Sequence, residues 1–178
     1  MAMPVDILCL SGASAVAIVA AGFDLRTRQI PDRLTWPAVA IGITCRAVLG
    51  GWRAGLIAFA AALLAFLILR ILYALRTMGG GDVKLLTAVA AFASMPATFE
   101  VMFWTAMFGG VMAVLLMLFK GQLGRLFSNT SELLEHNFKN GLKPHPEMNL
   151  KNPAMVKLPY AVPIAAACLM VLILRGSL

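Results

Sequence analysis

Apolar residues gather into six runs along the chain, separated by short polar breaks. These runs lie near residues 5–23, 36–50, 54–75, 83–97, 100–119 and 159–175. The first and third approach the roughly 20 residues that an α-helix needs to cross about 30 Å of hydrocarbon. The second and fourth have only 15 residues each, so they would need flanking residues or a locally thinner membrane. The pattern predicts about six transmembrane helices.

The composition indicates that the chain lives in a bilayer. Hydrophobic residues make up 61% of the sequence and charged residues 13%, with a mean hydropathy of +0.86. Such a chain cannot cover itself with a polar surface. Its 178 residues leave room for one bundle but not for an added large soluble domain. We therefore expect an all-α polytopic membrane protein with a single membrane-embedded domain, residues 1–178.

The distribution of basic residues predicts the orientation. No Lys or Arg precedes the first run, which carries Asp6, so this run is expected to be a retained anchor and not a cleaved signal. If successive breaks alternate between the two sides, 12 of the 15 basic residues fall on one side, and only Arg46, Arg53 and Arg175 on the other. The positive-inside rule makes the first side cytoplasmic. Both termini, and Asp6, would then lie outside.

The longest polar stretch, residues 120–158, is cytoplasmic in this topology. Its sequence predicts one helix that begins near Ser131 and stops near Gly141. Three apolar side chains would share one face of that helix: Leu133, Leu134 and Phe138. A helix of this kind lies in the plane of the membrane surface.

Cysteines and histidines give no sign of a metal site or cofactor. Cys9, Cys45 and Cys168 all lie in apolar runs, with no CxxC pair, so we expect buried, reduced thiols. His136 and His145 stand on either side of a helix stop and are expected to be exposed loop residues. The net charge of +7 follows from the orientation rule and from anionic lipid, so no nucleic acid partner is implied.

Two acids stand at the ends of apolar runs, and the topology puts both at the cytoplasmic boundary. Asp24 closes the first run, and Asp82 follows Gly79, Gly80 and Gly81. An acid within the membrane costs about 2.5–3.5 kcal/mol, so such acids are functional candidates. Glycines would let the backbone adopt positive φ and approach a neighbour closely. Two carboxyls that share one proton and one water would carry out aspartic protease chemistry.

Each acid also has a structural interpretation. Asp82 could be the N-cap of the helix that follows it. Asp24 could be an interfacial acid paired with Arg26 or Arg28, and such exposed pairs contribute only about 0–1 kcal/mol. Asp32 is expected to open a turn or a helix.

Three segments together resemble the type IV prepilin peptidases. They are residues 24–35 (DLRTRQIPDRLT), 78–85 (MGGGDVKL) and 157–164 (KLPYAVPI), and they occur in the family's order. The family's Gly-x-Gly-Asp motif falls on Gly79, Gly81 and Asp82, and its first catalytic Asp falls on Asp24. The resemblance implies that Asp24 and Asp82 are the catalytic pair.

The resemblance also implies a function. The family removes the basic leader from type IV prepilins and pseudopilins at the cytoplasmic face of the inner membrane, just before an apolar helix, by a water that two aspartates activate. Its bifunctional members carry a CxxC domain where this chain has only residues 24–35, so neither zinc nor N-methyltransferase activity is expected. The short form resembles the minimal TadV/CpaA type, which implies an Flp-like substrate. The expected partners are the leader peptide, the bilayer and other pilus-assembly proteins.

Two alternatives stay open at this point. The presenilin-like intramembrane proteases share the glycine-aspartate motif and are the nearest enzymatic alternative. The rival from another class is a non-enzymatic pilus-assembly scaffold or a small ion-coupled transporter that uses Asp24 and Asp82. The sequence does not say which aspartate would be the base and which the acid.

Overall fold

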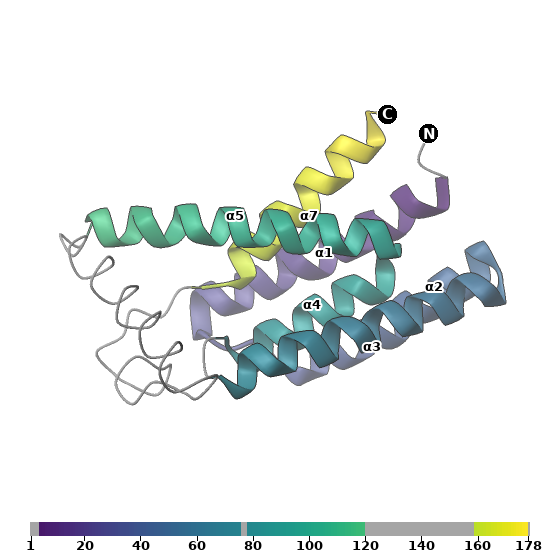
Figure 1. The fold of residues 1–178 in the computed structure, drawn as a ribbon, viewed down its shortest axis with the longest axis horizontal. Coiled ribbons are helices and arrows are strands. Elements are labelled where there is room, and N and C mark those ends of the chain that lie inside the picture. Colours follow the sequence, from purple (N-terminus) through teal and green to yellow (C-terminus); the bar gives the residue numbers. More distant parts are fainter. Residues whose placement is uncertain (1–3, 76–77, 120–158, 178) are drawn as a thin grey trace, which may run out of the picture.

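The described chain is a bundle of α-helices (Figure 1). The computed structural model describes residues 4–75, 78–119 and 159–177, and within them it contains six helices and no strand. The helices are α1 (Pro4–Thr27), α2 (Asp32–Gly50), α3 (Trp52–Ala74), α4 (Gly80–Phe92), α5 (Met95–Phe119) and α7 (Ala161–Gly176). The predicted all-α class is confirmed. The interfacial helix predicted within residues 120–158, and both histidines, lie outside the described residues.

Two helix boundaries differ from the apolar pattern. Helix α2 begins at Asp32, ahead of its apolar run, after Pro31 in an extended conformation (φ −69°, ψ 136°). The break predicted between residues 97 and 100 is wrong, because α4 ends at Phe92 and α5 begins at Met95. Ala93 is extended (φ −75°, ψ 155°). Pro96 then falls in the first turn of α5, where a missing N–H does no harm.

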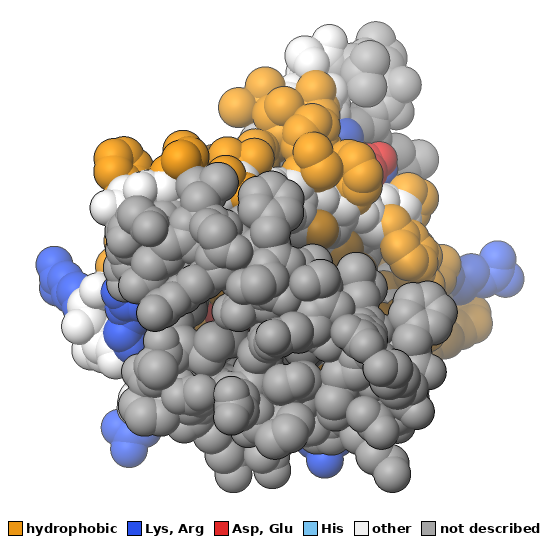
Figure 2. Space-filling model, turned by 60° about the vertical axis from the view of Figure 1, so that its left-hand side comes forward, with side chains coloured by type: hydrophobic (Ala, Val, Ile, Leu, Met, Phe, Trp, Pro, Cys, Tyr) orange, Lys and Arg blue, Asp and Glu red, His pale blue; other side chains and the backbone are white. Residues whose placement is uncertain are grey.

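Three of the helices are long and apolar enough to cross a bilayer. The candidate spans are Val5–Thr27 in α1, Trp52–Ala74 in α3 and Met95–Leu116 in α5. Large apolar side chains point outward from them, and Figure 2 shows such side chains on one face, with Lys and Arg at its margins. Apolar surface of this extent is expected where helices meet lipid.

Helix α4 lies inside the bundle. It packs against α1, α2 and α3, as Figure 1 shows, and its side chains from Leu85 to Phe92 are buried. With 13 residues it is about 20 Å long, too short to cross the membrane by itself. Alanines line the buried faces of the helices around it, for example Ala13, Ala17, Ala20, Ala58, Ala61 and Ala65. Small residues allow such close helix packing in membranes.

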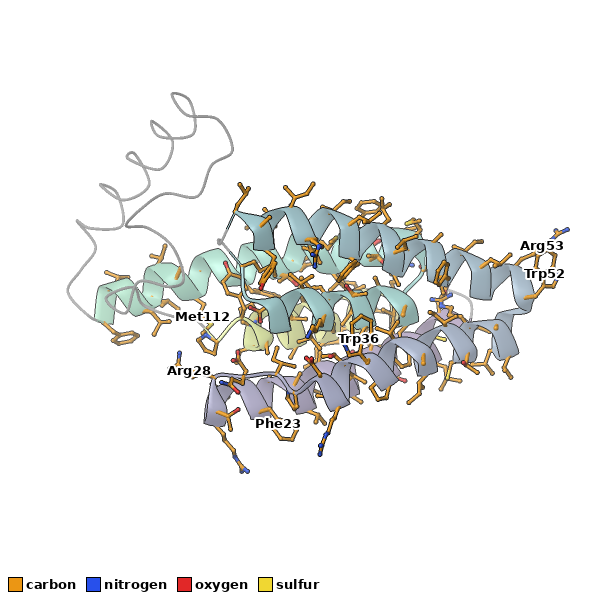
Figure 3. The ribbon with its side chains drawn as sticks, turned by 90° about the horizontal axis from the view of Figure 1, so that it is seen from below. Phe23, Arg28, Trp36, Trp52, Arg53 and Met112 are labelled. Atoms are coloured by element: carbon orange, nitrogen blue, oxygen red, sulfur yellow. The ribbon has the colours of Figure 1, made fainter. Side chains whose placement is uncertain are left out.

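Different segments of the chain lie at the two ends of the bundle. The N- and C-termini lie at one end, and the end of α1 lies with the starts of α4 and α7 at the other (Figure 1). Figure 3 likewise places Arg28, just after α1, far from Trp52 and Arg53 at the α2–α3 turn. That turn contains Gly51, whose φ of 83° suits a residue without a Cβ. Segments that are distant in sequence therefore meet at one end.

A buried arginine joins three helices near the chain termini. Arg46 of α2 donates from Nη1 to Asp6 Oδ1 of α1 (2.6 Å) and from Nε to the Phe92 carbonyl oxygen of α4 (2.7 Å). Its side chain is only 9% exposed. Asp6 thus has a structural partner away from Asp24. The three cysteines are free thiols, and two of them, Cys9 and Cys168, are buried.

We expect Asp6→Asn to destabilise the protein by about 2–3 kcal/mol, because it leaves the buried Arg46 charge without its counter-ion. The matched control is Asp32→Asn, which breaks the Asp32–Lys84 ion pair, whose side chains are 61% and 30% exposed. That change should cost at most about 1 kcal/mol. Unfolding in detergent with increasing denaturant measures both values, and equal losses would contradict the expectation.

Candidate active site

Asp24 is buried at the end of α1, where it contacts the start of α7. It is 7% exposed, and its Oδ2 accepts a hydrogen bond from the Ala161 N–H at 3.3 Å. Helix α1 stops soon afterwards, because Arg28 adopts a left-handed conformation (φ 54°) and donates its N–H to the Asp24 carbonyl oxygen at 2.9 Å. The interpretation of Asp24 as an exposed surface acid is wrong.

Asp82 lies in the first turn of α4, where it is partly buried. The N-cap of this helix is Gly79, with φ −72° and ψ 146°, so the interpretation of Asp82 as the N-cap is wrong. Its carboxylate accepts a hydrogen bond from the backbone of Gly79. This is the position and the contact of the third helical residue in a capping box. The carboxylate is therefore folded back over the glycines.

The three glycines allow close approach but not positive φ. A Cβ on Gly79 would lie 2.7 Å from Asp82 Oδ2, one on Gly80 3.2 Å from Tyr73 Cε2, and one on Gly81 3.1 Å from Ile30 Cβ. The expected close approach is confirmed. The positive φ that glycine permits is not found at any of the three.

The two acids lie at the same end of the bundle, where α1 ends and α4 begins. Asp24 and Asp82 are close enough for their charges to interact, and Tyr160 interacts electrostatically with Asp82. Tyr160 stands directly before Ala161, the residue that donates to Asp24. A Cβ on Gly109 of α5 would lie 3.3 Å from the Tyr160 ring. Helices α1, α4, α5 and α7 thus all contribute to this region.

An ion pair flanks the acids. Lys84 Nζ donates to Asp32 Oδ1 at 2.6 Å, which ties the start of α2 to α4 just beyond Asp82. Asp32 begins α2, as predicted. In the described part of the chain, no three His, Cys, Asp or Glu side chains lie together in a way that could hold a metal ion.

Comparison with known families adds to this geometry. The sequence profile of the type IV leader peptidase family matches residues 12–114. This segment is more than half of the chain and contains both Asp24 and Asp82. The chain belongs to the type IV leader peptidase family. It is therefore a protease, and its three long apolar helices are those of a membrane protein. No curated protein and no solved structure matches the chain.

Two features of this region had no role in the sequence analysis. The Pro-Tyr segment contributed to the resemblance, but nothing in it indicated that Tyr160 would lie beside Asp82 or that the backbone N–H of Ala161 would reach Asp24. Every residue except proline has a backbone N–H, so the sequence does not single out this one. Its contact with Asp24 is visible only once α7 is packed against α1.

Replacement of Gly79 by Ala is expected to lower leader-peptidase activity about 10- to 100-fold. The added Cβ would need the space that Asp82 Oδ2 occupies, and a displacement near 1 Å can cost about 100-fold in rate. The side chain can rotate away, so folding should be preserved. Initial rates of precursor cleavage, and unfolding in detergent, measure the two effects.

Gly80→Ala is the matched control for that substitution. Its Cβ would meet the ring of Tyr73 at 3.2 Å, and this ring is exposed and free to move aside. The control should keep activity within about threefold of the wild type. Equal activity in both variants would show that Gly79 does not hold the Asp82 carboxylate in place.

Proposed function

We propose that this leader peptidase is an aspartic endopeptidase in which Asp24 and Asp82 activate a water molecule. The observation that carries the proposal is that Asp24 is buried and lies close enough to Asp82, on a different helix, for their charges to interact. Two adjacent carboxyls cannot both ionise cheaply, so one keeps a proton while the other is available as a base. Aspartic proteases use this division of roles.

The proposed reaction is hydrolysis of one peptide bond. The ionised carboxylate takes a proton from water as the water oxygen attacks the scissile carbonyl carbon, and the protonated carboxyl donates its proton to the carbonyl oxygen. The tetrahedral diol then collapses and the C–N bond breaks, as the amine nitrogen takes up the proton first removed from water. One diol hydroxyl returns its proton to the carboxylate that acted as the acid, so the carbonyl of the new carboxyl group forms and the starting protonation state is restored. The proton transfers balance whether Asp24 is the base and Asp82 the acid or the reverse.

The proposed substrates are Flp-like type IV prepilins or pseudopilins, cleaved at the cytoplasmic face of the inner membrane. Membership of the leader peptidase family supports a prepilin substrate. The 12 basic residues assigned to one side of the membrane support cleavage at its cytoplasmic face. We propose one domain with six membrane-embedded helices and both termini outside. The position of both termini at the end of the bundle opposite the acids (Figure 1) agrees with that topology.

The minimal TadV/CpaA type is the proposed subtype. Only residues 28–31 join α1 to α2, which leaves no room there for the CxxC domain of the bifunctional enzymes. We accordingly propose leader cleavage without N-methylation. Mass spectrometry of the processed pilin's new N-terminus would show an unmodified amine.

A cleavage assay tests the proposed mechanism. A candidate Flp prepilin is co-expressed with the wild type, Asp24→Asn or Asp82→Asn, and its processing is followed by gel shift and terminal sequencing. Each substitution removes a group that transfers a proton, so cleavage should fall by at least about 100-fold. Asp32→Asn, a change in an exposed ion pair at the same end of the bundle, should keep its activity.

The amount of each variant in the membrane is measured in parallel, so that a failure to insert is not mistaken for a loss of catalysis. Continued processing by both aspartate variants would overturn the two-aspartate mechanism. A scaffold or ion-coupled transporter that uses Asp24 and Asp82 would then be the better account.

A further inference from the structure

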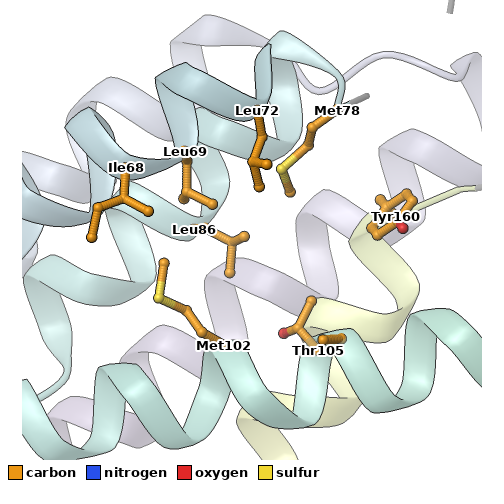
Figure 4. Close-up of a pocket in the computed structure, with 9 residues that line it drawn as sticks. Ile68, Leu69, Leu72, Met78, Leu86, Met102, Thr105 and Tyr160 are labelled. Atoms are coloured by element: carbon orange, nitrogen blue, oxygen red, sulfur yellow. The ribbon is translucent and has the colours of Figure 1, made fainter. Parts of the chain in front are cut away.

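An apolar cavity extends from Tyr160 into the bundle. Its volume is about 380 Å³, and it lies between α3, α4 and α5, with Tyr160 at the end next to α7 (Figure 4). Apolar side chains such as Leu69, Leu86 and Met102 form most of its wall. The volume is within the usual range of ligand pockets. It suits a few side chains, and a whole helix would not fit.

Tyr160 and Met78 link the cavity to the candidate active site. Tyr160 lines it and interacts electrostatically with Asp82. Met78 lines it too and directly precedes the glycines that lead to Asp82. A peptide whose scissile bond lies at the acids would thus have its neighbouring residues at the mouth of this cavity.

One wall residue has a polar group without a partner. Thr105 of α5 is 4% exposed, and its buried Oγ1 has no hydrogen-bond partner among the residues that the structure describes. The buried hydroxyls of Thr87 and Thr98 instead donate to the carbonyl oxygens of Val83 and Ser94, four residues earlier, at 2.8 and 3.0 Å. Figure 4 shows the Thr105 side chain between Met102 and Tyr160 at the cavity. Buried polar groups are nearly always paired, so this hydroxyl indicates an absent partner.

The chemistry of that partner favours a peptide over a lipid chain. A hydrocarbon tail would match the apolar wall, but it has no atom that accepts a hydrogen bond. A peptide bond that is to be hydrolysed has to leave the helical conformation, and the carbonyl groups beside it then lack partners in an apolar environment. An extended apolar segment supplies both the side chains that fill the cavity and a carbonyl oxygen for Thr105.

We propose that the cavity holds apolar side chains of the substrate next to its scissile bond, and that Thr105 Oγ1 donates a hydrogen bond to a backbone carbonyl of that segment. This assignment rests on the proposed peptidase function and names the part of the substrate that the site selects. Thr105 is a substrate-binding residue in this arrangement and takes no part in the proton transfers.

The first test is the isosteric change Thr105→Val, with cleavage kinetics of a purified precursor in detergent. Loss of one hydrogen bond should raise KM about three- to tenfold, with kcat nearly unchanged, because the bond is made in both the ground state and the transition state. The matched control is Thr98→Val on the same helix, where the hydroxyl already donates to the Ser94 carbonyl oxygen. A purely structural role for Thr105 would leave KM at the wild-type value, and that result would overturn the assignment.

The second test fills the cavity. Ala106 lines it and is exposed, whereas its neighbour Met107 is exposed and does not line it. Ala106→Trp should therefore raise KM at least about tenfold, and Met107→Trp should not. Equal KM values for the two variants would mean that lipid, or nothing, occupies the cavity, and the inference would fail.

A binding readout separates this inference from the proposed mechanism. A precursor with a photoreactive group on the apolar residues beside its scissile bond is cross-linked to the Asp82→Asn variant, with and without Ala106→Trp. A yield of adducts on Met78 or Met102 that falls at least threefold with Ala106→Trp supports the cavity assignment. Adducts confined to α1 or α2 overturn it.

The two proposals can fail separately. If the wild type cleaves the precursor and the cavity variants keep the wild-type KM, only the cavity assignment fails. If Asp24→Asn and Asp82→Asn both cleave, the proposed mechanism fails.

Discussion

The hydrogen bond from the Ala161 N–H to Asp24 Oδ2 joins residues that are 137 positions apart, and the arrangement of the site depends on it. The first N–H groups of a helix have no partner within that helix, and a carboxylate at this end is favourable because of the helix dipole. This contact holds the start of α7 against the end of α1. It thereby sets the position of Tyr160 beside Asp82.

Helix α4 supplies the second acid from the centre of the bundle. It is short, it is enclosed by α1, α2 and α3, and it makes polar contacts at both ends. Lys84 pairs with Asp32 near its start, and the Phe92 carbonyl oxygen accepts a hydrogen bond from Arg46 at its end. The exposed Asp32–Lys84 pair adds little to the position of the helix, whereas the buried Arg46 side chain restricts its end. Asp82 is thus presented to Asp24 by a helix that is packed on three sides.

Tyr160 lies between the acids and the apolar cavity. It interacts electrostatically with Asp82 and also lines the cavity, whose wall is otherwise apolar apart from Thr105. A membrane peptidase needs both the acids and an apolar wall, because its substrate has one bond that must meet water and neighbouring residues that avoid it. The unpaired hydroxyl of Thr105 marks where the backbone of such a segment would need a partner.

The sequence by itself determined the all-helical class, because a chain this apolar must satisfy its backbone hydrogen bonds within helices. The motifs around Asp24 and Asp82 also singled out these two acids. The sequence misplaced the α4–α5 break, because apolar residues continue across Ala93 and hydropathy does not mark a turn between two apolar helices. It left open positive φ at the glycines and an N-cap role for Asp82, and the structure shows neither. Only the tertiary structure decided that Asp24 receives the Ala161 N–H, that Asp82 folds back over Gly79 and that Thr105 faces a cavity without a partner. These contacts join backbone groups and side chains of separate helices, and their geometry exists only once the helices have packed.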